Sequence, residues 1–205
     1  SVKIVAGLEA PMDQNTSDQK VLFEASMMDV ALDIAQRAHL GQVRRGDRSP
    51  YITHPVRVRA IAQRFGYSKL VQVVAIVHDA VEDAEDPDTT SREIKSKLPA
   101  VHPIVMSMTH ARGTPYLDYV VGMEGETLQA KLSDMLHNLM DGPSPRQRQK
   151  YKSALTAIFA SRGGPPKEIH PGHWAEISQQ AGFESEHIGE SLLREFISGT
   201  LSNVA

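Results

Sequence analysis

Apolar residues recur at three- and four-residue spacing along most of the chain. In residues 18–39 the apolar positions at this spacing are Leu22, Ala25, Met28, Ala31, Ile34, Ala35 and Ala38. Such spacing keeps one face of an α-helix apolar, whereas no segment shows the sustained alternation that is typical of a strand. The pattern predicts an all-α fold, a bundle of about eight to ten helices.

Glycine and proline residues separate the expected helices. Residues 41–54 contain two glycines and a proline and are expected to form a loop. Pro55 then suits the first turn of a helix, where its missing N–H group would have no partner, and Gly66 ends that helix. Further helices are expected from about Ser68 to Asp83, after a Thr or Ser cap within 86–99, and at about 101–109, 125–141 and 146–161.

A Gly-Gly-Pro-Pro run at 163–166 is the one internal boundary that the sequence suggests. It divides a main domain, residues 20–162, from a C-terminal helical extension, residues 163–205, and residues 1–19 form an N-terminal extension. The extension beyond the boundary is expected to contain two amphipathic helices. We expect their apolar faces either to pack on the core or to form the contact of a homodimer.

Composition and charge narrow the class of protein. The 205 residues are 40% apolar and 23% charged, with a formal net charge of −3. That balance argues against a nucleic-acid binder, but it allows a small phosphorylated ligand. Without cysteine the chain has no disulfide and no thiolate metal site. It also lacks a signal-peptide pattern and an apolar run of roughly 18 residues, so we expect a cytoplasmic protein without membrane contact.

The segment VHDAVED, residues 77–83, places four ionisable side chains directly after an almost wholly apolar run. On a helix that continues to Asp83, four-residue spacing pairs His78 with Glu82 and Asp79 with Asp83. Burying unpaired carboxylates is unfavourable by several kcal/mol, and a divalent cation removes that penalty. Imidazole and carboxylate ligands suit Mn²⁺, Fe²⁺ or Zn²⁺. The alternative is a solvated helix end, because the acidic run continues.

Two other segments can complete such a site. YITHP places His54 at a junction between a loop and a helix, and KLSDMLHNLM places Asp134 and Asn138 four residues apart on an otherwise apolar helix. A buried aspartate and a buried asparagine need polar partners. Two histidines and two aspartates would form a mixed nitrogen–oxygen metal site with room for water.

His54, the pair His78-Asp79 and Asp134 follow the H…HD…D pattern of the HD-domain metal-dependent phosphohydrolases. The segments AHLGQVRRGDRSPYITHP, IVHDAVEDA and KLSDMLHNL closely resemble the hydrolase domain of the RelA/SpoT alarmone enzymes, and resemble the stand-alone small alarmone hydrolases even more. The resemblance covers about residues 20–160. It implies an HD-domain helical bundle and a hydrolase-only enzyme, because the remaining residues are too few for a synthetase domain.

The resemblance also implies the chemistry. It implies a manganese ion held by His54, His78, Asp79 and Asp134. The pair Glu82-Asp83 is expected to assist the attacking water, and either carboxylate can accept or relay a proton. The implied substrate is a nucleotide with a 3′-pyrophosphate, such as (p)ppGpp, and the products are GDP or GTP and pyrophosphate.

Nearby cations are expected to neutralise phosphate charge. Arg44, Arg45 and Arg48 lie in the loop before His54, and Lys131 lies one turn before Asp134. For each of them a solvated surface charge is the alternative. The resemblance implies that Arg44 and Arg45 contact the nucleotide. It implies further pocket residues at Asn138 and Tyr151.

Departures from the family pattern leave the substrate open. Met135, Met140 and Asp141 stand where long alarmone hydrolases have two arginines and a threonine, and the loop RRGDRSP is one residue longer. An adenine alarmone, (p)ppApp, is therefore an alternative to (p)ppGpp, as is NADPH, which animal relatives dephosphorylate. A non-catalytic alarmone sensor is a third interpretation, although it would not need Glu82 and Asp83.

The remaining histidines carry no recognisable pattern. His170 and His173 in HPGHW are expected to be surface residues, and His39 and His137 have no evident partner.

Overall fold

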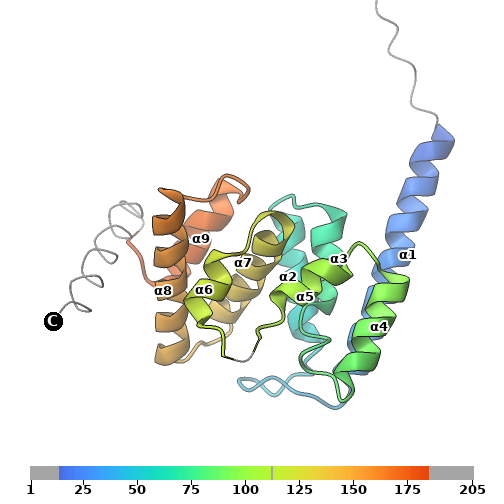
Figure 1. Cartoon of the computed structure of the whole chain (residues 1–205), viewed down its shortest axis with the longest axis horizontal. Helices are drawn as coiled ribbons and strands as arrows, with labels where there is room; N and C mark the ends of the chain where they lie inside the picture. Colours follow the sequence, from blue (N-terminus) through green and yellow to red (C-terminus); the bar gives the residue numbers. More distant parts are fainter. Residues whose placement is uncertain (1–13, 112, 185–205) are drawn as a thin grey trace, which may run out of the picture.

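Nine α-helices make up the fold in residues 14–111 and 113–184, the part of the chain that the computed structural model describes (Figure 1). They are α1 (Gln14–Ala38), α2 (Thr53–Arg64), α3 (Lys69–Val77), α4 (Pro87–Lys97), α5 (His102–Met108), α6 (Tyr116–Val121), α7 (Gly125–Met140), α8 (Pro145–Arg162) and α9 (Pro171–Ala181). The expected all-α bundle of eight to ten helices is confirmed for these residues.

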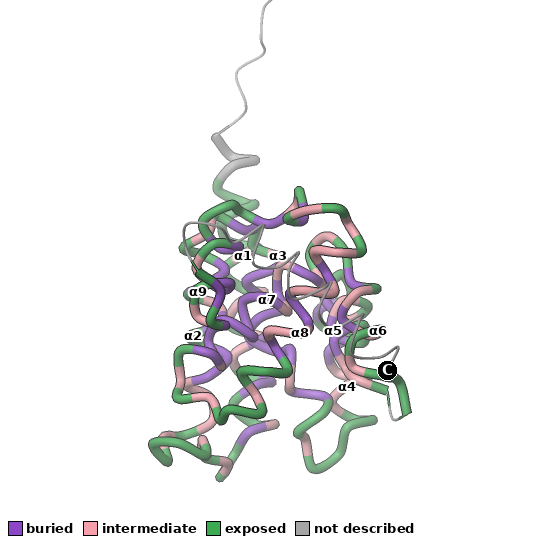
Figure 2. The backbone as a smooth tube through the Cα atoms, turned by 90° about the vertical axis from the view of Figure 1, so that its left-hand side faces the viewer, coloured by how far each residue is buried: buried purple, intermediate pink, exposed green. Residues whose placement is uncertain are grey.

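Two apolar clusters hold the helices together. The first joins α1, α3, α4 and α5 through residues such as Ile34, Val74 and Ile94. The second joins α6, α7, α8 and α9 and includes Leu136 and Ile158. Helices α2 and α7 contribute to both clusters and pack against α3. Residues 71–77 of α3 are all buried, and Figure 2 shows the buried backbone along the middle of the molecule. Side chains at the meeting point of α2, α3 and α7 are therefore held from both sides.

Helix α3 ends at Val77, so the expectation of a helix continuing to Asp83 was wrong. Its first turn is capped by Ser68, whose hydroxyl accepts from the Val71 amide. At the other end the His78 ring nitrogen Nδ1 lies 2.9 Å from the Ala75 carbonyl oxygen. In a continued helix that carbonyl would accept from the Asp79 amide. The histidine side chain satisfies it instead, and residues 78–82 form turns.

The cap of α4 also differs from the prediction. The carboxylate of Asp86, rather than a Thr or Ser hydroxyl, accepts from the Thr89 amide at 3.0 Å. Asp86 also accepts from the Thr89 hydroxyl at 2.6 Å. Aspartate is as good an N-cap as serine, and Pro87 follows it in the first helical turn.

Helix α9, the first of the two helices expected beyond the Gly-Gly-Pro-Pro run, packs on the core. It contacts α7 and α8, and Trp174 and Ile177 belong to the second apolar cluster. The second expected helix lies outside the described residues, and the proposed domain boundary stays a prediction. None of the described helices combines the length and the apolar character needed to cross a membrane.

His173 is buried, which corrects the expectation that it lies at the surface. Its ring stacks on Phe65 with centroids 4.5 Å apart and planes 6° apart, and its Nδ1 lies 2.8 Å from the Tyr67 hydroxyl oxygen. Two aromatic residues from the end of α2 thus enclose an imidazole from α9. His170 is exposed, as expected, and its Nδ1 accepts from the Gly172 amide at the start of α9.

Candidate metal centre and nucleotide cavity

The four side chains predicted as metal ligands converge where α2, α3 and α7 meet. His54 is the second residue of α2, His78 and Asp79 follow α3 directly, and Asp134 lies in α7. His54 Nε2 lies 3.2 Å from an Asp134 carboxylate oxygen, and His78 Nε2 lies 3.0 Å from one of Asp79. Both imidazoles are 1% exposed and Asp134 is 6% exposed, while Asp79 is 21% exposed and gives the cluster its access to solvent.

The imidazole of His78 is oriented for a metal ion. Because its Nδ1 donates to the Ala75 carbonyl, the neutral ring has its lone pair on Nε2. This Nε2 is buried and makes no hydrogen bond among the described residues, and it lies 3.0 Å from an Asp79 carboxylate oxygen. Donor atoms of His54, His78 and Asp134 all lie within 4.8 Å of one another. A divalent cation would satisfy these lone pairs at once, so the donor set fits a metal ion.

The electrostatics of the cluster also favour a cation. Burial opposes a charge on His78, but the carboxylates of Asp79 and Asp134 outweigh it and raise the pKa of that imidazole to about 10. Without a metal ion the ring therefore carries a proton on Nε2, and a bound cation would take the place of that proton. Burial likewise opposes ionisation of Asp134, yet Lys131 and the two histidines hold the pKa of that carboxyl well below its usual range. The two aspartates therefore remain anionic and attract positive charge.

Asp134 is held in place by neighbours on its own helix. Lys131 Nζ lies 2.9 Å from one carboxylate oxygen, and the Asn138 amide nitrogen lies 2.6 Å from the other. Lys131 and Asn138 were predicted as substrate contacts; in this structure both contact Asp134. Spacings of three and four residues put all three side chains on one face of α7.

Asp79 is oriented by Tyr51. The Tyr51 hydroxyl donates to the Asp79 carboxylate at 2.7 Å. Burial, followed by the charge of Asp79, raises the pKa of this hydroxyl, so it stays protonated and remains a donor. The sequence interpretation missed Tyr51, although the residue stands three positions before His54. No spacing rule connects it to Asp79, which is 28 residues away.

Glu82 and Asp83 lie on the turns that follow α3 and are exposed. They do not share a helical face with the ligands, because α3 has already ended. Partial desolvation, followed by the charge of Asp79, raises the pKa of both carboxyls. Asp83 is fixed through its backbone, since its amide donates to the Asp79 carbonyl at 2.9 Å and Gln42 donates to its carbonyl at 2.7 Å. Carboxylates with a raised pKa are better proton acceptors near neutral pH.

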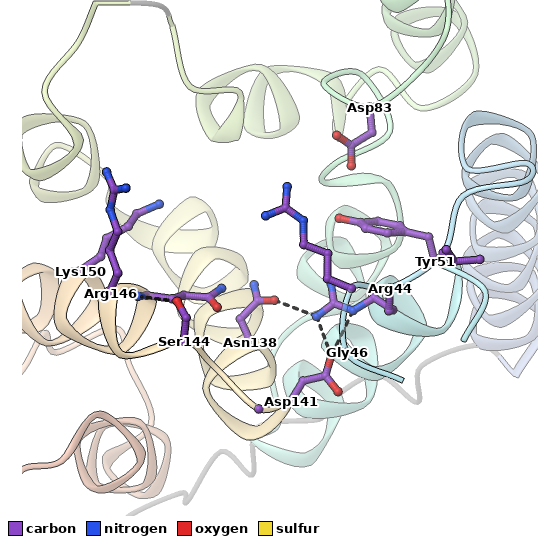
Figure 3. A pocket seen from close by; sticks show the side chains of 13 residues that line it. Arg44, Gly46, Tyr51, Asp83, Asn138, Asp141, Ser144, Arg146 and Lys150 are labelled. Carbon is purple, nitrogen blue, oxygen red and sulfur yellow. Dashed lines mark hydrogen bonds and ion pairs between the residues drawn. The ribbon is translucent and has the colours of Figure 1, made fainter. Parts of the chain in front are cut away.

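A cavity of about 840 Å³ lies beside this cluster (Figure 3). Tyr51 and Asn138 line it and also contact Asp79 and Asp134, so the cavity and the cluster share a wall. Its charged lining residues are Arg44, Arg45, Arg146, Lys150, Asp83 and Asp141. Small-molecule sites occupy roughly 300–1,000 Å³, so the cavity has the size and the excess of cations that a nucleotide needs.

The predicted loop arginines lie in different surroundings. Arg44 and Arg45 line the cavity, whereas Arg48 is exposed and outside it. The Arg44 guanidinium donates to the Asp141 carboxylate at 2.7 Å and to the side-chain oxygen Oδ1 of Asn138 at 3.0 Å. Figure 3 shows this pair at the floor of the cavity, between the loop and the end of α7.

Helix α8 supplies cations that the sequence interpretation missed. Arg146 and Lys150, four residues apart on that helix, line the cavity on the side away from Tyr51 (Figure 3). Their spacing could have indicated a shared face. The predicted pocket residue Tyr151 is buried beside them, and its hydroxyl oxygen lies 3.4 Å from the side-chain nitrogen Nε2 of Gln147.

His137 is a further residue that the sequence interpretation missed. Its Nδ1 lies 2.8 Å from Nδ1 of His54 in the interior. Burial, followed by the nearby His54, lowers the pKa of His137 to about 4, so it is neutral at physiological pH. Its position three residues after Asp134 could have indicated that it faces the same site.

Comparisons with known proteins agree with this arrangement. No family model matches the chain. Among solved structures, the chain resembles one described as a metazoan ortholog of SpoT that hydrolyzes ppGpp, with a TM-score of 0.60 and 21% identity. The match covers 77% of this chain and 96% of the other. At that identity the likeness shows a shared fold.

Curated relatives match through their sequence. A probable GTP pyrophosphokinase of Mycobacterium leprae is 30% identical over 155 residues, 65% of this chain and 18% of the relative. A guanosine-3′,5′-bis(diphosphate) 3′-pyrophosphohydrolase of Borreliella burgdorferi is 27% identical over 128 residues, 57% of this chain and 19% of the relative. The chain thus spans under one fifth of the length of these two relatives.

A shorter relative is matched over most of its length. The guanosine-3′,5′-bis(diphosphate) 3′-pyrophosphohydrolase MESH1 of Danio rerio is 30% identical over 138 residues, which are 62% of this chain and 72% of that protein. The helical bundle with its buried histidine–aspartate cluster is that of an HD-domain protein. Within this class, the chain belongs to the family of small alarmone hydrolases that includes MESH1, which confirms the resemblance found in the sequence.

Proposed function

We propose that this protein is a metal-dependent hydrolase that removes the 3′-pyrophosphate from alarmone nucleotides, (p)ppGpp or (p)ppApp. The products are a nucleoside 5′-diphosphate or 5′-triphosphate and pyrophosphate. One observation carries the proposal: His54, His78, Asp79 and Asp134 converge beside a cavity of nucleotide size that is lined by four cations. The names of the curated relatives support the same activity.

In this proposal His54, His78, Asp79 and Asp134 hold the metal ion. Their mixed nitrogen and oxygen donors suit Mn²⁺, with Fe²⁺ or Zn²⁺ as the other candidates. When bound, a divalent ion supplies hydroxide near neutral pH and neutralises phosphoryl charge. Tyr51 and Lys131 orient the two carboxylates, through contacts of 2.7 Å and 2.9 Å.

Proton transfer falls to Glu82 and Asp83. Both lie at the exposed side of the cluster, next to Asp79, whose charge adds to partial desolvation in raising the pKa of each. A carboxylate in such a place can accept the proton of the attacking water. Asp83 also lines the cavity, so it faces both the cluster and the substrate.

The cationic wall of the cavity holds the phosphates. Phosphoryl transfer depends mainly on positioning and charge neutralisation. Arg45, Arg146 and Lys150 line the cavity and are available for this task, while Arg44 is already paired with Asp141. The nucleotide then lies between the loop that precedes α2 and the first turns of α8.

Product analysis tests the proposal. The protein is incubated with ppGpp, ppApp or NADPH in the presence of Mn²⁺, and the released phosphates are separated. Pyrophosphate from either alarmone supports the proposed activity. Orthophosphate from NADPH, with neither alarmone cleaved, would identify a nucleotide phosphatase instead. Tight binding of an alarmone without any product would identify a sensor.

A further inference from the structure

Two histidines from distant parts of the chain meet in the interior beside the candidate metal centre. Nδ1 of His54 in α2 lies 2.8 Å from Nδ1 of His137 in α7, and the two residues are 83 positions apart. The ring centroids are 4.9 Å apart and the rings are tilted by 50°. Both residues are buried. At this distance one of the two nitrogens carries a proton and the other accepts it.

The other nitrogen of His54 decides which of them is the donor. His54 Nε2 faces the carboxylates, at 3.2 Å from Asp134 and 3.6 Å from Asp79. To offer a lone pair to a metal ion at that side, His54 must carry its proton on Nδ1. His137 Nδ1 is then the acceptor, and the proton of His137 sits on Nε2. The reverse arrangement would place a proton on His54 Nε2 and close that ligand position.

In His78 a hydrogen bond to a backbone carbonyl places a proton on Nδ1. Its Nδ1 donates to the carbonyl oxygen of Ala75, three residues earlier. The equivalent carbonyl for His54 is that of Tyr51, which already accepts from the His54 amide at 2.8 Å. His54 therefore takes its acceptor from a side chain on another helix. Hydrogen bonds of this kind fix the tautomer and the ring orientation of metal-binding histidines.

We infer that His137 is a positioning residue that sets the Nδ1–H tautomer of His54 and thereby prepares Nε2 to bind the metal ion. The inference rests on the metal site of the proposed function. The orientation of His54 on α2 would then depend on a residue of α7, the helix that also supplies Asp134. His137 needs no contact with the substrate or with the ion.

Nitrogen-15 NMR of the metal-free protein tests the tautomer without any need for activity. Protonated and unprotonated ring nitrogens have well-separated shifts, and the His54 signals are assigned by their absence in His54→Gln. The expected result is a proton on His54 Nδ1 in the parent protein and its loss in His137→Leu. A His54 ring without a proton on Nδ1 in the parent would overturn the inference, whether or not the protein binds metal.

Metal affinity provides the second readout. Competition with a chelator for Mn²⁺ and Zn²⁺ should show binding weakened by about 10- to 100-fold in His137→Leu. His137→Asn should stay close to the parent, because the asparagine Oδ1 can stand where Nδ1 stood and accept the hydrogen bond from His54 Nδ1–H. His102→Leu is the matched control, since His102 contacts Ser91 in another part of the fold.

The two readouts separate the inference from the proposed function. Helical circular dichroism and the melting temperature establish that each variant is folded before its affinity is compared. If folded His137→Leu binds metal as tightly as the parent, His137 does not position His54. If the parent binds no divalent ion, the proposed function fails, while the NMR measurement on the parent still decides how the histidine pair shares its proton.

Discussion

The Arg44 guanidinium and the Asp141 carboxylate form an ion pair at 2.7 Å inside the cavity, with side chains only 15% and 22% exposed. Asn138 accepts from the same guanidinium at 3.0 Å and donates to Asp134 at 2.6 Å. A chain of contacts therefore runs from the loop arginine to the metal cluster. Asp141, which stands where the sequence resemblance expects a threonine, restrains Arg44 and balances its charge.

This pair predicts a non-additive effect on substrate binding. Arg44→Ala removes the cationic partner of Asp141 and leaves that carboxylate unpaired beside the phosphates, so KM should rise by about 10- to 100-fold, with a smaller loss in kcat. Arg44→Ala combined with Asp141→Asn should recover part of the loss, because the repelling carboxylate is gone. Steady-state kinetics at low ionic strength measure both. A double variant no better than Arg44→Ala would show that the ion pair does not face the substrate.

Removal of Asp79 should abolish metal binding and activity together. The residue contacts His54, His78 and Tyr51, so Asp79→Ala removes a carboxylate from the centre of the site. The metal content of the purified protein, measured by elemental analysis, checks this. Asp88→Ala, which removes an exposed carboxylate on α4, is the control. Stoichiometric metal in folded Asp79→Ala would show that Asp79 is not a ligand.

Glu82→Gln should keep the fold and the metal ion but lose turnover. The substitution changes little volume and removes a proton acceptor, so kcat should fall by about 100- to 10,000-fold. Asp83→Asn, assayed in parallel, shows which of the two carboxylates handles the proton. Glu85→Gln provides an exposed control on the same segment. Turnover at the parent rate in Glu82→Gln would leave that residue a structural role only.

The buried His173 should make the protein less stable in acid. Burial lowers the pKa of this imidazole from 6.5 to about 4, so between these values the unfolded chain binds more protons than the folded protein. The contribution of His173 to the free energy of unfolding is complete above about pH 6.5. It is lost as the pH falls towards 4, a change on the order of 3 kcal/mol.

Denaturant unfolding of the parent and His173→Gln at several pH values between 4 and 7 measures this effect. The comparison uses the dependence on pH rather than the absolute free energy of unfolding, which the substitution also changes. The lowered pKa of His137 makes the stability depend on pH in the same direction. His137 is present in both proteins, so its effect cancels in the comparison. Equal slopes in the two proteins would contradict the assignment to His173.

The helices could be predicted from the sequence because their stability depends on a local apolar period and on local end signals. Pro55 and Gly163 mark helix ends where they were expected. The end of α3 could not be predicted in this way, because it depends on a contact between the His78 ring and a carbonyl. His78 and Asp79 could still be predicted as members of the cluster, since they follow the buried α3 whether or not the helix continues.

The contacts of the supporting residues could not be found by spacing alone, although the three-residue spacing of Asp134 and His137 does indicate a shared face. Tyr51 reaches Asp79 and His137 reaches His54 only after α2, α3 and α7 have packed together. The same holds for Arg44, whose partner Asp141 is 97 residues away. His173 was placed at the surface because two histidines in a loop are usually surface residues, but Phe65 and Tyr67 enclose it.

The most direct test of the central claim is phosphorus NMR of ppGpp incubated with the protein and Mn²⁺. A metal site at His54, His78, Asp79 and Asp134 that acts on the 3′-pyrophosphate predicts signals of GDP and free pyrophosphate, absent with a chelator and absent with Asp79→Ala. Release of orthophosphate alone, or unchanged ppGpp in the presence of bound metal, would contradict the account.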